Sequence, residues 1–242
     1  MSDTKVTATP VVETNEALVK AKGFWAQFSK PIIYAGTAII LLGAGYLGYQ
    51  KFIKEPKEAK ANESIFMAES VFDKMTTSGF SKDSVNVVIN GGVLGEDKIT
   101  GLLKVISNYG GTKAANRARY MVGASYLHIG EFDKAIKYLK EFDGSGANQV
   151  QSVAYTLLGH AYAEKKQTDE AFSYYKKAAS VNEKDEAMTP AALLIAGNYA
   201  EVTGKSKDAI ELYRKLKDKY PTFSSVSNGD VDKLLARLGE FK

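Results

Sequence analysis

The two histidines, His128 and His160, carry the side chains best suited to proton transfer or metal binding near neutral pH. The 242-residue chain has no cysteine, which excludes thiol nucleophiles and thiolate ligands. Glu164 follows His160 by four residues and would share its helix face. A tetrahedral metal site needs more ligands than His160 and Glu164 supply. The sequence therefore predicts no catalytic residue, no metal site and no cofactor.

Two glycine pairs, at 90–92 and 109–112, are the other elements that could hold a ligand. Neither has the lysine and the strand-to-helix setting of a phosphate-binding loop, so both predict turns or helix ends. The net charge is +4, and most of the excess lies in residues 1–30 and 51–62. Because phosphate contacts dominate nucleic-acid affinity, the nearly neutral remainder predicts no nucleic-acid partner.

An uncharged stretch at residues 31–50 lies between Lys30 and Lys51. A helix of this length extends roughly 30 Å, the thickness of the hydrocarbon core of a bilayer. Apolar residues cover all its faces, and aromatic residues flank it, as expected at the two membrane interfaces. We expect an uncleaved transmembrane helix in contact with lipid, rather than a buried helix or a cleaved signal.

Small residues lie on one face of this stretch, where another membrane helix could approach closely. The predicted membrane-helix packing residues are Thr37, Ala44 and Gly48. Orientation stays open, because three lysines shortly precede the stretch and four shortly follow it.

Composition divides the chain into four expected segments. Residues 1–22 are polar and predict a disordered tail, and residues 23–53 predict an amphipathic approach and the transmembrane helix. Residues 54–62 predict a charged juxtamembrane linker, kinked or broken at Pro56. Apolar spacing predicts a helical repeat domain over residues 63–242. Around and within it we expect a first helix at about 62–76, a structured loop at 79–98 and a capping helix at about 229–241.

Small residues recur in register through the second half of the chain. Gly123, Gly159 and Gly197 are separated by 36 and 38 residues. An alanine follows each glycine at the same distance, at Ala135, Ala171 and Ala209. Small residues let the two helices of a hairpin approach, while Leu139, Tyr175 and Tyr213 fill the space beside them. One hairpin cannot bury its apolar face alone, so the pattern predicts hairpins that stack.

This pattern resembles the tetratricopeptide repeat family over roughly residues 115–221. Besides the glycines and alanines, the resemblance rests on Tyr126, Tyr162, the turn around Gly130 and a proline that closes the third repeat. Two features differ: the loops between repeats are longer, and Ala200 stands where the two tyrosines predict an aromatic residue. The expected fold class is all-α, with an N-terminal transmembrane helix followed by a tetratricopeptide-like α-solenoid of helical hairpins.

In this family the first helix of each hairpin usually lines a concave surface that binds peptides or partner helices. By resemblance, the predicted partner-binding groove contains Arg117, Tyr120, His128, Thr156, His160, Glu164, Asn198 and Glu201, together with Leu127, Leu194 and Val202. The mixture of weakly polar and apolar side chains fits a broad partner surface better than a peptide's terminal carboxylate.

The order of polar tail, single anchor and helical repeats resembles the YfgM-like family of ancillary subunits of the bacterial Sec translocon. Residues 15–52 and 59–75 carry most of this resemblance. It implies a non-enzymatic single-pass protein of the bacterial inner membrane, with a cytoplasmic N-terminus and a periplasmic repeat domain. The implied partners are membrane channel subunits, and a periplasmic chaperone or nascent secretory chains.

Two other functions stay open. Residues 102–142 also resemble envelope repeat proteins of Bacteroidetes, in keeping with a periplasmic adaptor for envelope assembly that is independent of the translocon. A cytosol-facing receptor of the organelle-import kind would likewise combine an N-terminal anchor with such repeats.

Overall fold

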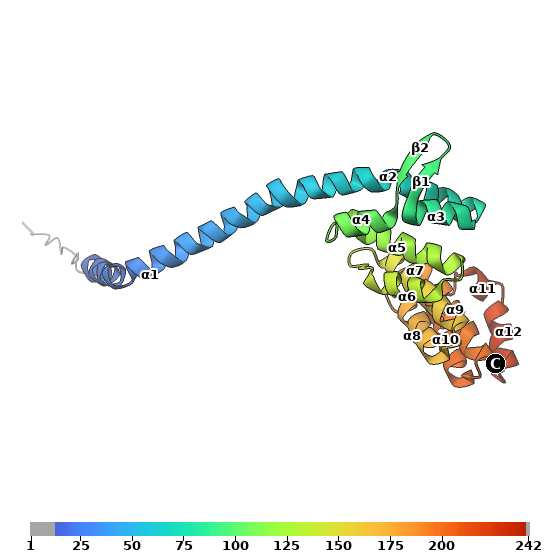
Figure 1. Ribbon diagram of the computed structural model, residues 1–242. Coiled ribbons are helices and arrows are strands. Elements are labelled where there is room, and N and C mark those ends of the chain that lie inside the picture. Colours follow the sequence, from blue (N-terminus) through green and yellow to red (C-terminus); the bar gives the residue numbers. More distant parts are fainter. Residues whose placement is uncertain (1–12, 241–242) are drawn as a thin grey trace, which may run out of the picture. The chain divides into compact units, whose positions relative to one another are not determined.

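A computed structural model describes the backbone of residues 13–240 and the side chains from Leu18 onward (Figure 1). The chain divides into two compact units, residues 1–56 and 57–242. The part of the predicted disordered tail at 1–12 lies outside the described residues, as do the last two residues of the chain. Residues 13–22 are helical, so the predicted tail is wrong there. The helix that begins at Glu13 extends into the apolar stretch, and elongating an existing helix is easier than nucleating one.

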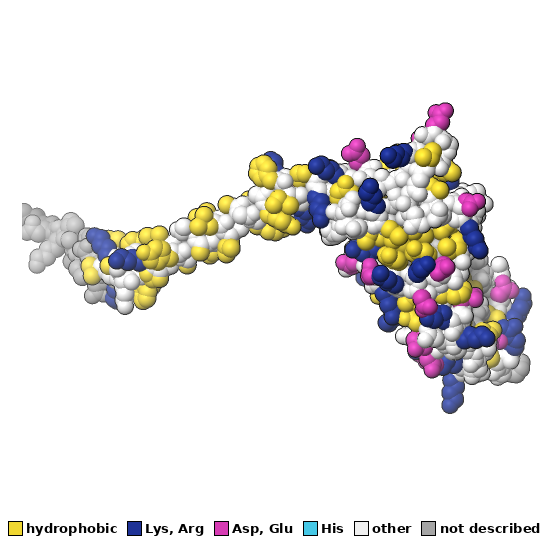
Figure 2. Space-filling model, in the orientation of Figure 1, with side chains coloured by type: hydrophobic (Ala, Val, Ile, Leu, Met, Phe, Trp, Pro, Cys, Tyr) yellow, Lys and Arg dark blue, Asp and Glu magenta, His cyan; other side chains and the backbone are white. Residues whose placement is uncertain are grey.

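The first unit consists of α1 (Glu13–Tyr49) and a π-helical segment, η1 (Gln50–Lys54). Within the described residues, α1 belongs to the single helix that is long and apolar enough to cross a membrane. Its apolar side chains are exposed, with Ile39 69% and Leu42 76% accessible. Hydrophobic side chains lie along α1 in Figure 2, and basic side chains gather near its beginning. This exposure is typical of a helix whose solvent is lipid.

Helix α2 (Glu55–Ser78) follows η1 without the break expected at Pro56. Pro56 lies inside a helix that is continuous from Leu18 to Ser78, and the π-helical segment η1 ends two residues before it. A change of the helical hydrogen-bond pattern beside a proline lets the helix continue past the missing N–H. Glu58 then accepts hydrogen bonds from the backbone N–H groups of Lys113 (2.8 Å) and Ala114 (3.1 Å). Lys57 Nζ donates to the Gly110 carbonyl at 2.9 Å. Residues 57–62 are thus part of the repeat domain, and the separate linker predicted there is wrong.

The segment 79–98 is more regular than the structured loop expected from its sequence. It contains α3 (Lys82–Asn90), β1 (Gly91–Leu94) and the start of β2 (Asp97–Thr100). The Ser81 side chain caps α3 by accepting from the Ser84 N–H, while Val85 and Val88 are fully buried. The two strands pair antiparallel, with Leu94 opposite Asp97. The polar and glycine residues of this segment favoured a loop in the sequence analysis, although it contains a short helix whose apolar face packs into the core.

The rest of the second unit is helical (Figure 1). After α4 (Leu102–Asn108) come the hairpins α5 (Lys113–His128) with α6 (Phe132–Glu141), α7 (Asn148–Glu164) with α8 (Thr168–Ala178), and α9 (Met188–Val202) with α10 (Ser206–Lys219). The chain closes with α11 (Ser224–Ser227) and α12 (Asp230–Arg237), in the region predicted for a capping helix. Successive hairpins bury apolar clusters between them. The all-α fold with stacked hairpins is confirmed.

Candidate partner-binding groove

The recurring glycines hold the two helices of each hairpin together. A Cβ atom on Gly159 would lie 2.5 Å from the Tyr175 ring, and one on Gly197 would lie 2.5 Å from the Tyr213 ring. In the first hairpin, Leu139 fills the same position, with its Cγ 2.6 Å from a Cβ built on Gly123. Any side chain larger than glycine would push the paired helix away. The packing role expected for these glycines and their larger partners is confirmed.

Each of the two tyrosines also fixes a polar side chain of the predicted groove. The Tyr175 hydroxyl lies 2.9 Å from His160 Nδ1. The Tyr213 hydroxyl lies 2.7 Å from Asn198 Oδ1 and 2.9 Å from Glu201 Oε2. Burial raises the pKa of both tyrosines, so they remain protonated donors. These bonds orient His160 and Asn198 at equivalent positions on neighbouring helices.

A shallow apolar pocket lies between α7 and α9 around these residues. Its cavity volume is about 300 Å³. The lining residues are His160, Tyr175, Ile195, Asn198, Tyr199 and Val202. The Tyr175 and Tyr199 rings pack with centroids 4.8 Å apart and form the wall, while Val202 is 79% exposed at the rim. The pocket can receive an apolar side chain of a partner, next to the polar edges of His160 and Asn198.

The electrostatics of the pocket favour a neutral histidine. Burial lowers the pKa of His160, and the nearby Glu164 carboxylate opposes this effect only partly. A neutral imidazole can accept a hydrogen bond from the Tyr175 hydroxyl at Nδ1 and keep an N–H at Nε2 for a ligand. Glu164 itself is exposed, one turn beyond His160. Near neutral pH the pocket therefore presents apolar surface and hydrogen-bonding edges, with little charge inside it.

The predicted groove residues of the first hairpin have other roles in the structure. Arg117 Nε donates to Glu69 Oε1 at 2.8 Å, and the same guanidinium bonds Asn62 at 3.1 Å, tying α5 to α2. Tyr120 packs between the rings of Phe72 and Phe142. These contacts stabilise the stacking of α5 against its neighbours. The structure does not bring Arg117 or Tyr120 to the pocket.

Three further predicted groove residues are also engaged within the domain. The His128 ring stacks on Phe80, with centroids 3.8 Å apart. The Thr156 hydroxyl donates to the Ser152 carbonyl of its own helix at 3.0 Å. Glu201 accepts from Arg237 Nε at 2.6 Å, which joins α9 to the capping helix α12. Hydrogen bonds from Arg237 lower the pKa of Glu201, so this pair is structural at neutral pH.

Sequence reasoning missed three lining residues: Tyr175, Ile195 and Tyr199. Tyr175 was assigned to the packing between helices, and it does pack there, but its ring edge also reaches the pocket. Ile195 and Tyr199 are four residues apart on α9 and share a face. That spacing is visible in the sequence, yet only the position of α7 shows which face borders the groove.

The small residues predicted to pack against another membrane helix lie on α1. Thr37 and Ala44 are exposed, and apart from the adjacent residues and the backbone of the same helix no heavy atom lies within 4 Å of a Cβ built on Gly48. Within the described residues, no other helix covers this face. Its role in packing against another membrane helix stays a prediction. Among residues 18–240, no group of three or more His, Asp or Glu side chains is placed to hold a metal ion.

Family models described as tetratricopeptide repeat match residues 117–143, 152–185 and 191–222. The three matches fall on the three hairpins formed by α5 to α10. The chain thus contains tetratricopeptide repeats, which indicate a scaffold for protein–protein interaction. No curated protein matches the chain.

Proposed function

We propose that this protein is a membrane-anchored, non-enzymatic scaffold that binds a protein partner through the groove between α7 and α9. The observation that carries the proposal is the apolar pocket walled by Tyr175 and Tyr199, with Val202 exposed at its rim. The accessible lining of this pocket is mostly apolar, and covering apolar surface with a partner side chain is favourable. A partner side chain in this pocket would cover that surface.

The charges around the groove favour an apolar ligand segment. Arg117 and Glu201, two of its predicted charged residues, are held by Glu69 and Arg237 within the domain. A partner that relied on them would first have to break these ion pairs. His160 and Asn198 are left to orient a ligand by hydrogen bonds. We therefore expect the groove to bind an apolar helix or an unfolded segment.

The more specific function that we propose for this scaffold is that of an ancillary subunit of the bacterial Sec translocon. The resemblance of residues 15–52 and 59–75 supports it, together with the one candidate membrane span. In this role the N-terminus is cytoplasmic and the repeats are periplasmic. The small-residue face of α1 at Ala44 contacts channel subunits, and the groove binds a periplasmic chaperone or nascent secretory chains.

Photocrosslinking in the cell from Ala44 and from Val202 tests this assignment. We expect Ala44 to capture a channel subunit and Val202 a chaperone or a nascent chain. Val150 supplies the control, since it is exposed and apolar on α7 but does not line the pocket. Crosslinks from Val202 to envelope proteins that persist after depletion of the translocon would replace the assignment by an envelope-assembly adaptor. Cleavage of the repeats by protease added to the cytosolic side would indicate an import-type receptor.

The pocket is tested separately with the partner captured in this way. Val202→Glu places a charge at the rim of an apolar pocket and should weaken binding at least tenfold, because burying an unpaired carboxylate is costly. Val150→Glu introduces the same charge on the same domain and should leave affinity unchanged. Equal affinities of both variants would remove the pocket from the binding site.

A further inference from the structure

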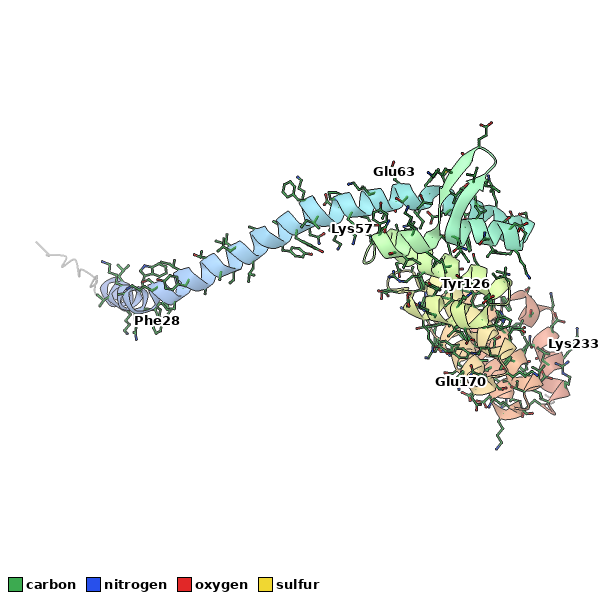
Figure 3. All side chains as sticks on the ribbon, viewed as in Figure 1. Phe28, Lys57, Glu63, Tyr126, Glu170 and Lys233 are labelled. Atoms are coloured by element: carbon green, nitrogen blue, oxygen red, sulfur yellow. The ribbon has the colours of Figure 1, made fainter. Side chains whose placement is uncertain are left out.

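The helix that precedes the candidate membrane span has two distinct faces. Leu18, Ala21, Trp25 and Phe28 follow one another at intervals of three, four and three residues and so form one stripe on α1. Phe24 extends the stripe, and its ring lies 4.9 Å from that of Phe28. The large side chains of the stripe are 40–57% exposed. In Figure 3 the sticks of this segment, Phe28 among them, project freely from the ribbon.

The other side of the same segment is basic. Gln27 and Lys30 lie opposite the apolar stripe, on a side that also carries the exposed Val19, and Lys20 and Lys22 lie at the two edges of the stripe. The segment 18–30 contains no acidic residue, so its three lysines give it a net charge of +3. Aromatic and aliphatic residues on one face with lysines on the other are typical of helices in the interface of a membrane. The charge is complementary to a bilayer surface that contains anionic lipids.

Pro31 separates this segment from the span. It lies inside α1, where it removes one helical hydrogen bond and its ring crowds the preceding turn. Figure 1 shows α1 changing direction near its beginning: the first turns are viewed along their axis, and the remainder runs across the picture. A bend at this point lets the segment before it follow a membrane surface while the helix after it crosses the bilayer.

We propose that residues 18–30 form an interfacial helix that binds the anionic surface of the bilayer on the side of the N-terminus. The apolar stripe enters the boundary between headgroups and acyl chains, to a depth of about 5–10 Å, and the lysines contact lipid phosphates. This inference rests on the membrane anchoring proposed above. It fixes the anchor at a defined depth in addition to the span.

The chain carries its own probe, because Trp25 is its only tryptophan. The full-length protein is reconstituted in vesicles of phosphatidylcholine with phosphatidylglycerol, and Trp25 quenching is measured with lipids brominated near the headgroup or near the chain end. We expect a blue-shifted emission, protection from aqueous acrylamide and stronger quenching by the shallow bromine. Strong acrylamide quenching with no lipid quenching would overturn the proposal. So would shielding from both quenchers, which would mean that protein covers the stripe.

Two matched double variants test the lipid charge. Lys20→Gln with Lys22→Gln should lose the difference in Trp25 depth between vesicles with and without phosphatidylglycerol. Lys51→Gln with Lys54→Gln removes the same charge after the span and should keep that difference. If the Lys20/Lys22 variant keeps the difference, these lysines do not contact the anionic lipid, and if the unchanged protein shows no difference, anionic lipid is not the ligand.

Extraction of the vesicles with alkaline carbonate separates this inference from the anchoring itself. Protein released by carbonate would contradict the transmembrane anchor. Protein that resists carbonate but exposes Trp25 to water would contradict only the interfacial helix.

Discussion

The first hairpin of the repeat domain differs from the second and third at the junction of its two helices. Gly123 faces Leu139, an aliphatic side chain, whereas Gly159 and Gly197 face Tyr175 and Tyr213. At the position after the glycine, the first hairpin has Ala124, and the others have His160 and Asn198, each bonded to its tyrosine. The same backbone arrangement therefore holds either a purely apolar junction or one linked to the groove by a hydroxyl group.

This difference places the candidate pocket. A tyrosine in the hairpin interior reaches through to the groove and holds a polar side chain there, which leucine cannot do. The pocket lies between the two helices that carry His160 and Asn198. The first hairpin instead uses its groove side for contacts with α2, through Arg117 and Tyr120. Binding and anchoring of the stack are thus divided between hairpins.

The largest effect is expected from filling the glycine positions. Gly159→Ala and Gly123→Ala should each reduce the free energy of unfolding by about 1–3 kcal/mol, because overpacking displaces a buried partner. Only Gly159→Ala should also weaken partner binding, since it moves Tyr175 and the pocket wall. Urea unfolding of residues 57–242, together with binding to the captured partner, measures both effects. Equal binding losses in the two variants would show that the tyrosine junction has no special role.

Removing the tyrosine hydroxyl should have a smaller effect on stability. Tyr213→Phe leaves Asn198 and the mostly buried Glu201 without this donor and should cost about 1–2 kcal/mol. Tyr175→Phe, which loses one bond, should cost less. Tyr138→Phe is the control, because its ring stacks on Tyr126 and, within the described residues, its hydroxyl is bonded to no groove side chain, unlike those of Tyr175 and Tyr213. Chemical denaturation of the three variants tests the order, and an equal cost for all would contradict it.

The turn inside the hairpins gives a third comparison, in which the second hairpin is the exception. Gly130 and Gly204 have φ values of 80° and 77°, and the equivalent Lys166 has a φ of 58°. A lysine in this left-handed conformation is strained where glycine is not. Lys166→Gly should raise the free energy of unfolding by about 1 kcal/mol. Gly130→Lys, the reciprocal change, should lower it, and a destabilised Lys166→Gly variant would contradict the argument.

The smallest effect expected is on pH dependence. Burial lowers the pKa of His160 in the folded state, so the unfolded chain binds a proton first as pH falls. Stability is therefore full above the ordinary histidine pKa, about 6.5, and decreases as pH falls through the folded-state value. Two groups lie next to the His160 ring. Tyr175 forms a hydrogen bond with Nδ1, and the Glu164 carboxylate offsets only part of the lowering of the pKa by burial. His160→Gln should flatten this pH dependence in thermal melts between neutral and acidic pH, while Lys166→Gly should leave its slope unchanged.

Sequence reasoning was most successful where the pattern is periodic. The glycines and alanines located the three hairpins, and family models match the same region. It failed at 79–98, where a short helix depends on the Ser81 cap and on a core into which Val85 and Val88 pack. It also failed at 57–62, whose charges suggested a solvated linker. Glu58 instead caps a helix more than fifty residues further along the chain.

The sequence by itself determined the apolar helix, the all-α class and the register of the repeats, because each follows from local spacing and from the size of single residues. Only the tertiary structure decided which groove residues are available to a partner. Arg117 and Glu201 differ from His160 and Asn198 in the neighbours that the stacked helices bring to them. Those neighbours come from other helices, and distance along the chain does not predict them. Whether a polar side chain can contact a partner depends on the charged groups and the surface that packing places beside it.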